Sequence, residues 1–153
     1  MNDISEWMAR YEEEQRLRKT LEPDATDHNK AVLFELLASA GIAKIIVDFD
    51  GYGDSGQIER VALLKADNVE CLPPEGNVAL HIVRHDGSGV DCVEMTVPEA
   101  IERLAYDFLG QEHSGWENND GAYGDFTFDV AERTITLEYN ERFTSSEQYS
   151  HTW

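Results

Sequence analysis

The chain has few basic residues, few cysteines and no long apolar run. Its 153 residues include 12 lysines and arginines against 31 aspartates and glutamates, which gives a formal net charge of −19. Such a charge repels nucleic acid and anionic membranes, so direct binding to either is not expected. The apolar stretches are far shorter than the ~20 residues that a membrane-spanning helix needs. A length of 153 residues is that of one domain with a single core.

Cysteine usage points to a reducing compartment. Cys71 and Cys92 are the two cysteines, and no C-x-x-C zinc pattern is present. Residues 1–4 lack the basic leader and apolar segment that begin a signal peptide. Two cysteines in a chain without such a signal indicate free thiols. We therefore expect a cytoplasmic protein.

The basic residues gather near the N-terminus. Arg10, Arg16, Arg18 and Lys19 are four of the twelve, and they lie within ten positions. Such a cluster is typical of a solvated helix whose arginines pair with glutamates one turn away, and it is also the one candidate for a local basic patch.

Hydrophobic periodicity predicts helices and strands. Ile4, Trp7, Met8 and Tyr11 recur at helical spacing, and Pro23 should break the chain before the next helix. A capping box from Thr96 to Glu99 begins the last helix. The expected helices span residues 4–21, 27–40 and 97–109; the expected hairpins pair residues 44–49 with 57–65, 78–83 with 90–96, and 126–130 with 135–139.

These elements predict an α+β fold. An antiparallel sheet built from three hairpins would carry two or three amphipathic helices packed on it. We expect residues 1–24 to form an N-terminal amphipathic helix, either an arm or a packing helix, and residues 25–153 to form a single acidic α+β domain.

Two acidic, glycine-rich runs echo each other and are the strongest candidates for a site. Residues 50–54 read Asp-Gly-Tyr-Gly-Asp, and residues 120–125 read Asp-Gly-Ala-Tyr-Gly-Asp. The first is predicted as a hairpin loop over residues 50–56, longer than a tight turn needs, and the second lies between a helix and a strand. The candidate partner- or ligand-binding residues are Asp50, Tyr52, Asp54, Gln57, Glu59, Trp116, Glu117, Asn118, Asn119, Asp120, Tyr123 and Asp125.

The same loops offer weak metal candidates and no catalytic residue. Asp48, Asp50, Gly53 and Glu59 match four positions of a calcium-binding loop, but strands replace the helices that an EF-hand requires. The weak candidates for Mg²⁺ or Ca²⁺ are Asp48, Asp50, Asp54 and Asp120. The alternative is that these aspartates bond their own backbone in turns. We expect no cofactor.

Three segments resemble a family of uncharacterised bacterial and mobile-element proteins. They are residues 53–59, which read GDSGQIE, residues 115–130, with the run GWENNDGAYGDFTFDV, and residues 140–147. The resemblance brings no known activity, but it implies a bacterial, plasmid or phage setting, in which small acidic proteins act against host defence systems.

Charge and setting together predict a non-enzymatic binding protein. It would dock a basic, nucleic-acid-binding protein, as a nucleic-acid mimic of the anti-CRISPR, anti-restriction or other anti-defence kind. The alternative is a divalent-cation-dependent enzyme or small-ligand-binding domain that uses the two glycine-rich loops. A homodimer joined through the helix that carries Trp7 is a third hypothesis.

Overall fold

The computed structural model describes residues 3–53, 55–118 and 120–153, and it confirms the α+β class. Asp54 and Asn119, two of the candidate residues, lie outside the described part. The elements are α1 (Asp3–Ser39), β1 (Lys44–Tyr52), β2 (Ser55–Leu64), β3 (Glu70–Cys71), β4 (Asn77–Val83), β5 (Val90–Thr96), α2 (Val97–Glu112), β6 (Ala122–Asp129) and β7 (Thr134–Glu141).

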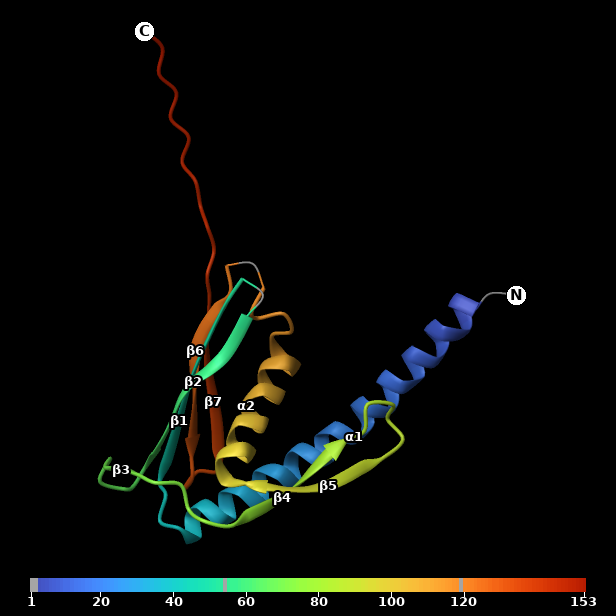
Figure 1. Cartoon of the computed structure of the whole chain (residues 1–153), viewed down its shortest axis with the longest axis vertical. Helices are drawn as coiled ribbons and strands as arrows, with labels where there is room; N and C mark the ends of the chain where they lie inside the picture. Colours follow the sequence, from blue (N-terminus) through green and yellow to red (C-terminus); the bar gives the residue numbers. More distant parts are fainter. Residues whose placement is uncertain (1–2, 54, 119) are drawn as a thin grey trace.

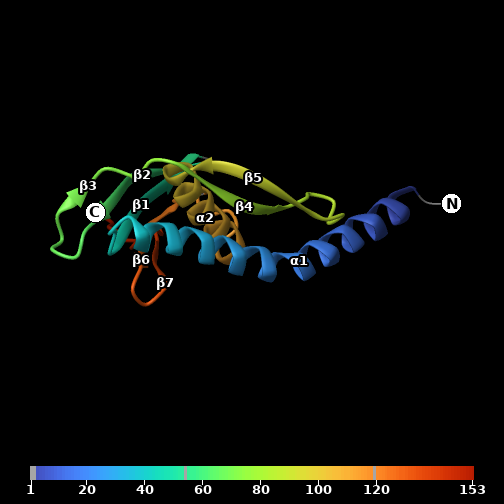
Figure 2. The same ribbon diagram turned by 90° about the horizontal axis from the view of Figure 1, so that it is seen from below.

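The strands form two antiparallel sheets. Five of them make the main sheet in the order β3-β2-β1-β6-β7, with β1 at its centre. The hairpin of β4 and β5, which the sequence predicts, forms a separate two-stranded sheet that lies along α1 (Figures 1 and 2). The hairpin of β6 and β7 is also confirmed.

One face of the main sheet carries the core. Residues of β1 alternate between buried and half-buried, so that Ile45, Val47 and Phe49 share one face. Leu33, Phe34 and Leu37 of α1 and the apolar stripe of α2 pack onto this face. In Figure 1, α2 lies on one side of the sheet and no helix of the described chain covers the other side, which we call the open face.

The expected break at Pro23 is wrong. A single helix, α1, runs from Asp3 to Ser39 with Pro23 inside it. Proline removes one backbone hydrogen bond, but residues on both sides of it pack on the same neighbours. Gly87 in the turn between β4 and β5 lies against Leu17, and Asn29 bonds to β4, so tertiary contacts hold the helix together across the proline. The N-terminal part of α1 projects beyond the rest of the molecule (Figures 1 and 2).

The predicted helix start at residue 97 is confirmed. The Thr96 side chain accepts a hydrogen bond from the Glu99 backbone, and the Glu99 side chain accepts one from the Thr96 backbone. Helix α2 then ends at Glu112, with Gly110 inside it. No helix in the described ranges combines the length and the apolar character needed to cross a membrane. Cys71 and Cys92 are both free thiols.

The expected long loop over residues 50–56 is wrong. Strand β1 continues through Asp50 and Gly51 to Tyr52, which pairs with Ser55 at the start of β2. Only Gly53 and the residue after it separate the strands, and Gly53 has the positive φ of 60° that two-residue hairpin turns require. The register of the β1–β2 pair shifts between Asp48 and Phe49, which marks a β-bulge, and both strands continue beyond it.

Candidate functional site

The two glycine-rich runs, far apart in sequence, lie against each other. A β-carbon at Gly51 would lie only 2.6 Å from Cζ3 of Trp116, and one at Gly56 would also meet that ring. Gly121 approaches the carbonyl of Gly51 so closely that any side chain would overlap it. Glycine is therefore required here for close approach, and the contacts join the β1–β2 hairpin to the loop that follows α2.

Arg142, which directly follows β7, ties this junction together. Its Nη1 donates a hydrogen bond to the carbonyl of Gly51 at 3.0 Å, and its backbone N–H donates to the carbonyl of Gly121. Its guanidinium lies 4.6 Å from the centre of the Tyr123 ring. One residue thus contacts both glycine-rich runs.

Arg142 also offsets the charge of Asp50. Nη1 lies 2.9 Å from Oδ1 of Asp50, close enough for an ion pair. No described residue donates a well-directed hydrogen bond to that buried oxygen, so charge attraction rather than hydrogen bonding holds the pair. This contact leaves Asp50 poorly placed as a ligand for a metal ion.

Aromatic side chains support the junction from the core side. Trp116 packs edge-on against Phe49, with ring centres 5.5 Å apart, and Tyr139 of β7 stacks on His113 at 3.6 Å. Burial raises the pKa of Tyr139 above its usual value, and the charges of Glu141 and Glu117 add to this effect. The hydroxyl of Tyr139 therefore stays neutral over the physiological pH range.

A cavity of about 330 Å³ opens beside the junction. Trp116, Asn118 and Asp120 line it, together with residues 141–144 from the end of β7. The Thr144 hydroxyl donates a hydrogen bond of 2.7 Å to Oδ2 of Asp120. Amide, carboxylate and aromatic groups from the second run and from the residue range just before it therefore line one cavity.

The junction lies within a region that matches a known family model. A model described as "Family of unknown function (DUF6878)" matches residues 25–153. The chain belongs to this family. No curated protein and no solved structure matches it. The DUF6878 match covers both glycine-rich runs and the whole main sheet, and it begins inside α1, so residues 3–24 of that helix lie outside it.

The other candidate residues of this DUF6878 chain are spread around the junction. Tyr52 is exposed at the tip of β1, and Gln57 of β2 donates a hydrogen bond to the side chain of Glu59. Glu117 is half-buried beside Gly51 and Gly56. These residues surround the contact between the two runs without converging on one point.

Metal ligands are not assembled here. Within residues 3–53, 55–118 and 120–153, no group of three or more His, Cys, Asp or Glu side chains has a geometry that could hold a metal ion. Asp48 and Asp50 lie on a strand rather than in the predicted loop, and Asp120 is bonded to Thr144. Asp54 lies outside the described residues.

The open face carries a row of three carboxylates next to the junction. Asp48 on β1 pairs in register with Asp125 on β6, and Asp125 pairs with Glu138 on β7. Desolvation raises the pKa of Asp125, and repulsion from Glu138 and Asp48 raises it further. Arg60, the base that faces Asp48 from β2, is bonded to Glu70 instead. We call Asp48, Asp125 and Glu138 the carboxylate row.

Sequence reasoning selected Asp125 but missed Glu138 and Arg142. Glu138 occupies an outward position of an alternating strand, where a charged residue is ordinary. Its significance comes from the register that places it opposite Asp125. Arg142 lies in the run of residues 140–147 that resembles the family, and that resemblance is the signal that the sequence offered for it.

Proposed function

We propose that this protein is a non-enzymatic binding protein whose open sheet face docks a basic surface of another protein. The observation that carries the proposal is the carboxylate row, in which like charges face each other across three neighbouring strands. Like charges in directly opposite cross-strand positions destabilise a sheet. A cationic partner would relieve this repulsion, so the face is better suited to a complex than to the free protein.

The surroundings of the row support a docking surface rather than a catalytic one. Thr127, Thr134 and Thr136 belong to the same strands, and Thr127 pairs with Thr136 in register. Thr134 and Thr136 are exposed, and no helix of the described chain covers this face, so a partner can reach it. The net charge of −19 would also speed the encounter with a basic partner, because long-range attraction raises association rates.

The partner in this proposal is a nucleic-acid-binding protein. Such a protein has a groove of lysines and arginines that normally contacts phosphates, and rows of carboxylates can occupy it as a mimic. The resemblance of residues 53–59, 115–130 and 140–147 to bacterial and mobile-element proteins supports an anti-defence role in the cytoplasm of a bacterial host. The row and the loop contacts that flank it would form the contact surface.

Two variants with equal net charge test the proposal. One replaces the row (Asp48→Asn, Asp125→Asn, Glu138→Gln), and the control replaces three exposed glutamates elsewhere (Glu75→Gln, Glu102→Gln, Glu132→Gln). Binding of a fluorescent deca-arginine peptide is measured by anisotropy. Because a contact between exposed charges contributes about 0.2–1 kcal/mol, we expect the row variant to bind about tenfold more weakly and the control to change little.

The outcome separates local from global electrostatics. An equal loss in both variants would show that only total charge matters and would reject the open face as the site. No loss in either would reject the proposal as well. Binding by the parent protein should also weaken between about 50 mM and about 500 mM NaCl, because salt screens charges at the surface.

A further inference from the structure

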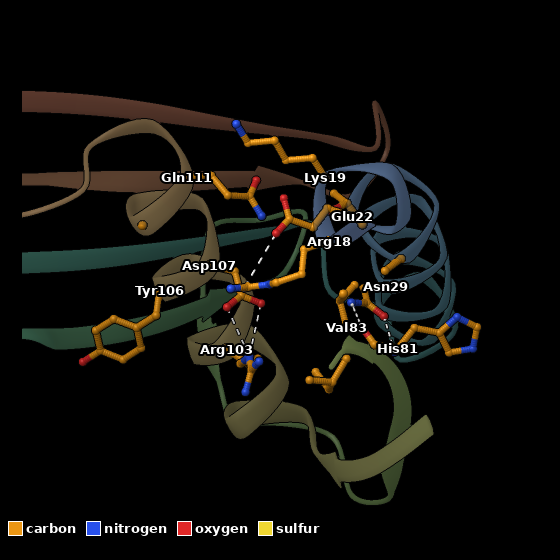
Figure 3. Close-up of a pocket in the computed structure, with 14 residues that line it drawn as sticks. Arg18, Lys19, Glu22, Asn29, His81, Val83, Arg103, Tyr106, Asp107 and Gln111 are labelled. Atoms are coloured by element: carbon orange, nitrogen blue, oxygen red, sulfur yellow. Dashed lines mark hydrogen bonds and ion pairs between the residues drawn. The ribbon is translucent and has the colours of Figure 1, made fainter. Parts of the chain in front are cut away.

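A larger cavity, of about 530 Å³, lies where α1, β4 and α2 meet, away from the open face (Figure 3). Its volume falls in the range of small-molecule sites. Its walls come from the middle of α1, the C-terminal half of β4 and residues 103–111 of α2, so it joins parts of the chain that are distant in sequence.

The cavity gathers positive charge in a strongly negative protein. Arg18, Lys19 and Arg103 line it, which is three of the twelve basic residues of the chain. Two acids, Glu22 and Asp107, line it as well, so its formal charge is +1 while the whole chain carries −19. An anion repelled by the rest of the surface would be attracted at this place.

The two acids do not neutralise the cations equally. Nε of Arg103 donates to both carboxylate oxygens of Asp107, at 3.2 Å each, so these two residues already satisfy each other. Partial burial raises the pKa of Asp107, while Arg103 and Arg18 act to lower it. Lys19 forms no ion pair with another residue in the described ranges.

Arg18 has hydrogen-bonding capacity that the protein does not use. Figure 3 shows its side chain extending from α1 across the cavity toward Asp107. Its Nη2 lies 3.7 Å from Oε1 of Glu22, too far for a hydrogen bond, and its buried Nε has no acceptor in the described chain. Buried charged donors are normally bonded, so this guanidinium is short of an acceptor.

The walls around Arg18 are firmly positioned. The Asn29 side chain donates to the carbonyl of His81 at 3.0 Å and accepts from its N–H at 2.6 Å. His28 stacks on His81 with ring centres 3.4 Å apart, and its Nε2 lies 3.1 Å from the carbonyl of Ala79. These contacts fix α1 on β4 at one wall of the cavity, and a firmly held wall contributes to the preorganisation that a binding site needs.

We infer that this cavity binds a small molecule through a phosphate or carboxylate group. An oxyanion would accept the Nε–H and an Nη–H of Arg18 in the bidentate arrangement that guanidinium groups favour. To reach it, Arg18 would give up the 3.7 Å contact with Glu22 and some of its attraction to Asp107, and the oxyanion would replace both. Lys19 on the same helix and Arg103 on the facing helix would add charge from two further directions.

The inference does not depend on the docking proposal, because the two surfaces share no residue. Arg18 and Lys19 lie outside the DUF6878 match, whereas Arg103 lies inside it. The site is therefore assembled from the family domain and from the helical segment that precedes it in this chain.

Nuclear magnetic resonance on the full chain tests the inference directly. The arginine Nε–H signals are followed while sodium phosphate or sodium succinate is added, with sodium chloride at equal ionic strength as the reference. We expect the Arg18 signal to shift in a saturable way, with Arg103 responding less, because the Nε of Arg103 is already bonded. A response to phosphate alone identifies a phosphate ligand, and a response to succinate alone identifies a carboxylate ligand; each supports the oxyanion site.

Matched variants provide the control. Arg18→Gln and Lys19→Gln should each weaken binding of the responding anion by about tenfold or more, since each removes a charge-assisted contact. Arg10→Gln changes net charge equally on the same helix but lies outside the cavity, and it should leave binding within about twofold. Arg103→Gln removes the cation on the α2 wall of the cavity, and the same binding measurement is made on it. No saturable shift up to about 10 mM of either anion, or an equal loss in Arg10→Gln, would overturn the inference.

Discussion

Arg142 donates a hydrogen bond of 3.0 Å to the carbonyl of Gly51, which precedes it by 91 residues. The bond crosses from the end of edge strand β7 to central strand β1, past β6 between them. It closes the end of the sheet at which the two glycine-rich runs meet. The shape of this end therefore depends on a residue that belongs to neither run.

Replacing Arg142 by alanine should destabilise the protein. The variant loses the bond to Gly51, the ion pair with Asp50 and the contact with the Tyr123 ring. Because the Arg142 side chain is about one-third exposed, we expect a loss of about 1–2 kcal/mol in the free energy of unfolding, less than for a buried charged bond. Urea denaturation measures it. Exposed Lys65→Ala is the control and should change stability by about 0.5 kcal/mol or less; equal effects would contradict the role of Arg142.

Alanine substitutions at Gly121 and Gly41 separate the cost of close backbone approach from the cost of backbone strain. Both have nearly the same positive φ, +79° and +77°, but Gly41 has open space around it and Gly121 abuts the carbonyl of Gly51. Alanine at Gly41 should cost about 1–2 kcal/mol from backbone strain alone. Alanine at Gly121 should cost at least about 2 kcal/mol more, because the backbones must separate. Thermal unfolding of both variants tests this, and similar costs would show that close approach is unimportant.

A third substitution keeps the test meaningful if Gly121→Ala does not fold. Gly51→Ala places a methyl group against the Trp116 ring, which is a side chain and can be shortened. The double variant Gly51→Ala, Trp116→Leu should therefore be less destabilised than the sum of the two single variants. Strict additivity would contradict the contact.

The local elements were predictable from sequence, but their assembly was not. The capping box from Thr96 to Glu99 and the alternation in β6 and β7 depend on neighbouring residues, and these expectations were confirmed. The break at Pro23 failed because contacts of Leu17 and Asn29 with the β4–β5 hairpin outweigh the local preference of proline. Long-range packing of this kind leaves no local signal in one sequence.

The candidate site shows the same limit. The two acidic runs could be selected by composition, and the structure shows that they meet. Arg142, which joins them, lies in a third run, residues 140–147, whose sequence gives no sign of that contact. The carboxylate row required knowledge of strand register, which pairs Glu138 with Asp125. The larger cavity depends on where a long helix crosses the fold, and the expected helix break hid that crossing.

Asn29 should contribute strongly to the attachment of α1. It is 4% exposed and bonds to both backbone groups of His81. Asn29→Ala removes the partner of a half-buried N–H and a half-buried C=O, so we expect a loss of about 2–4 kcal/mol in the free energy of unfolding. Hydrogen exchange of the His81 amide should accelerate in this variant. Exposed Asn77→Ala, on the same strand, is the control; unchanged protection of the His81 amide in Asn29→Ala would contradict the assignment.

Asp125 should make the protein less stable as the pH rises, the reverse of the usual effect of a carboxylate. Its folded-state pKa is raised above the ordinary value of 3.8, chiefly by desolvation and then by Glu138 and Asp48. The folded state therefore binds more protons than the unfolded state between these two pKa values, and its stability falls as the pH rises through that window. The destabilisation is complete above the raised pKa and absent below the ordinary one.

Asp125→Asn removes this destabilisation. We expect the variant to be more stable than the parent protein at pH 7, by about 0.2–1 kcal/mol for the opposed pairs, and we expect the gain to shrink as the pH approaches 4. Urea denaturation at several pH values measures it. Asp129→Asn, on the same strand but opposite Lys44 and Thr134, is the comparison and should show no such gain. A gain that grows on acidification would contradict the sign.

The projecting part of α1 should join two or more copies of the chain. Ile4, Trp7, Met8 and Tyr11 are about half to two-thirds exposed, and their helical spacing places them on one stripe. The stripe ends before Glu14, where the turn containing Gly87 covers the helix. Four large apolar side chains on an isolated helix favour association, because burying them removes apolar surface from water.

Light scattering tests this association. The parent protein should show an average mass above the 17.3 kDa of one chain, rising with concentration. Trp7→Lys with Tyr11→Lys should return it to one chain, whereas Ala9→Lys, on the opposite side of the helix, should not. Removing residues 1–12 should act like the double variant, because residues from Glu14 onward still pack on the β4–β5 turn. A mass of one chain in the parent protein at all concentrations would reject the interface.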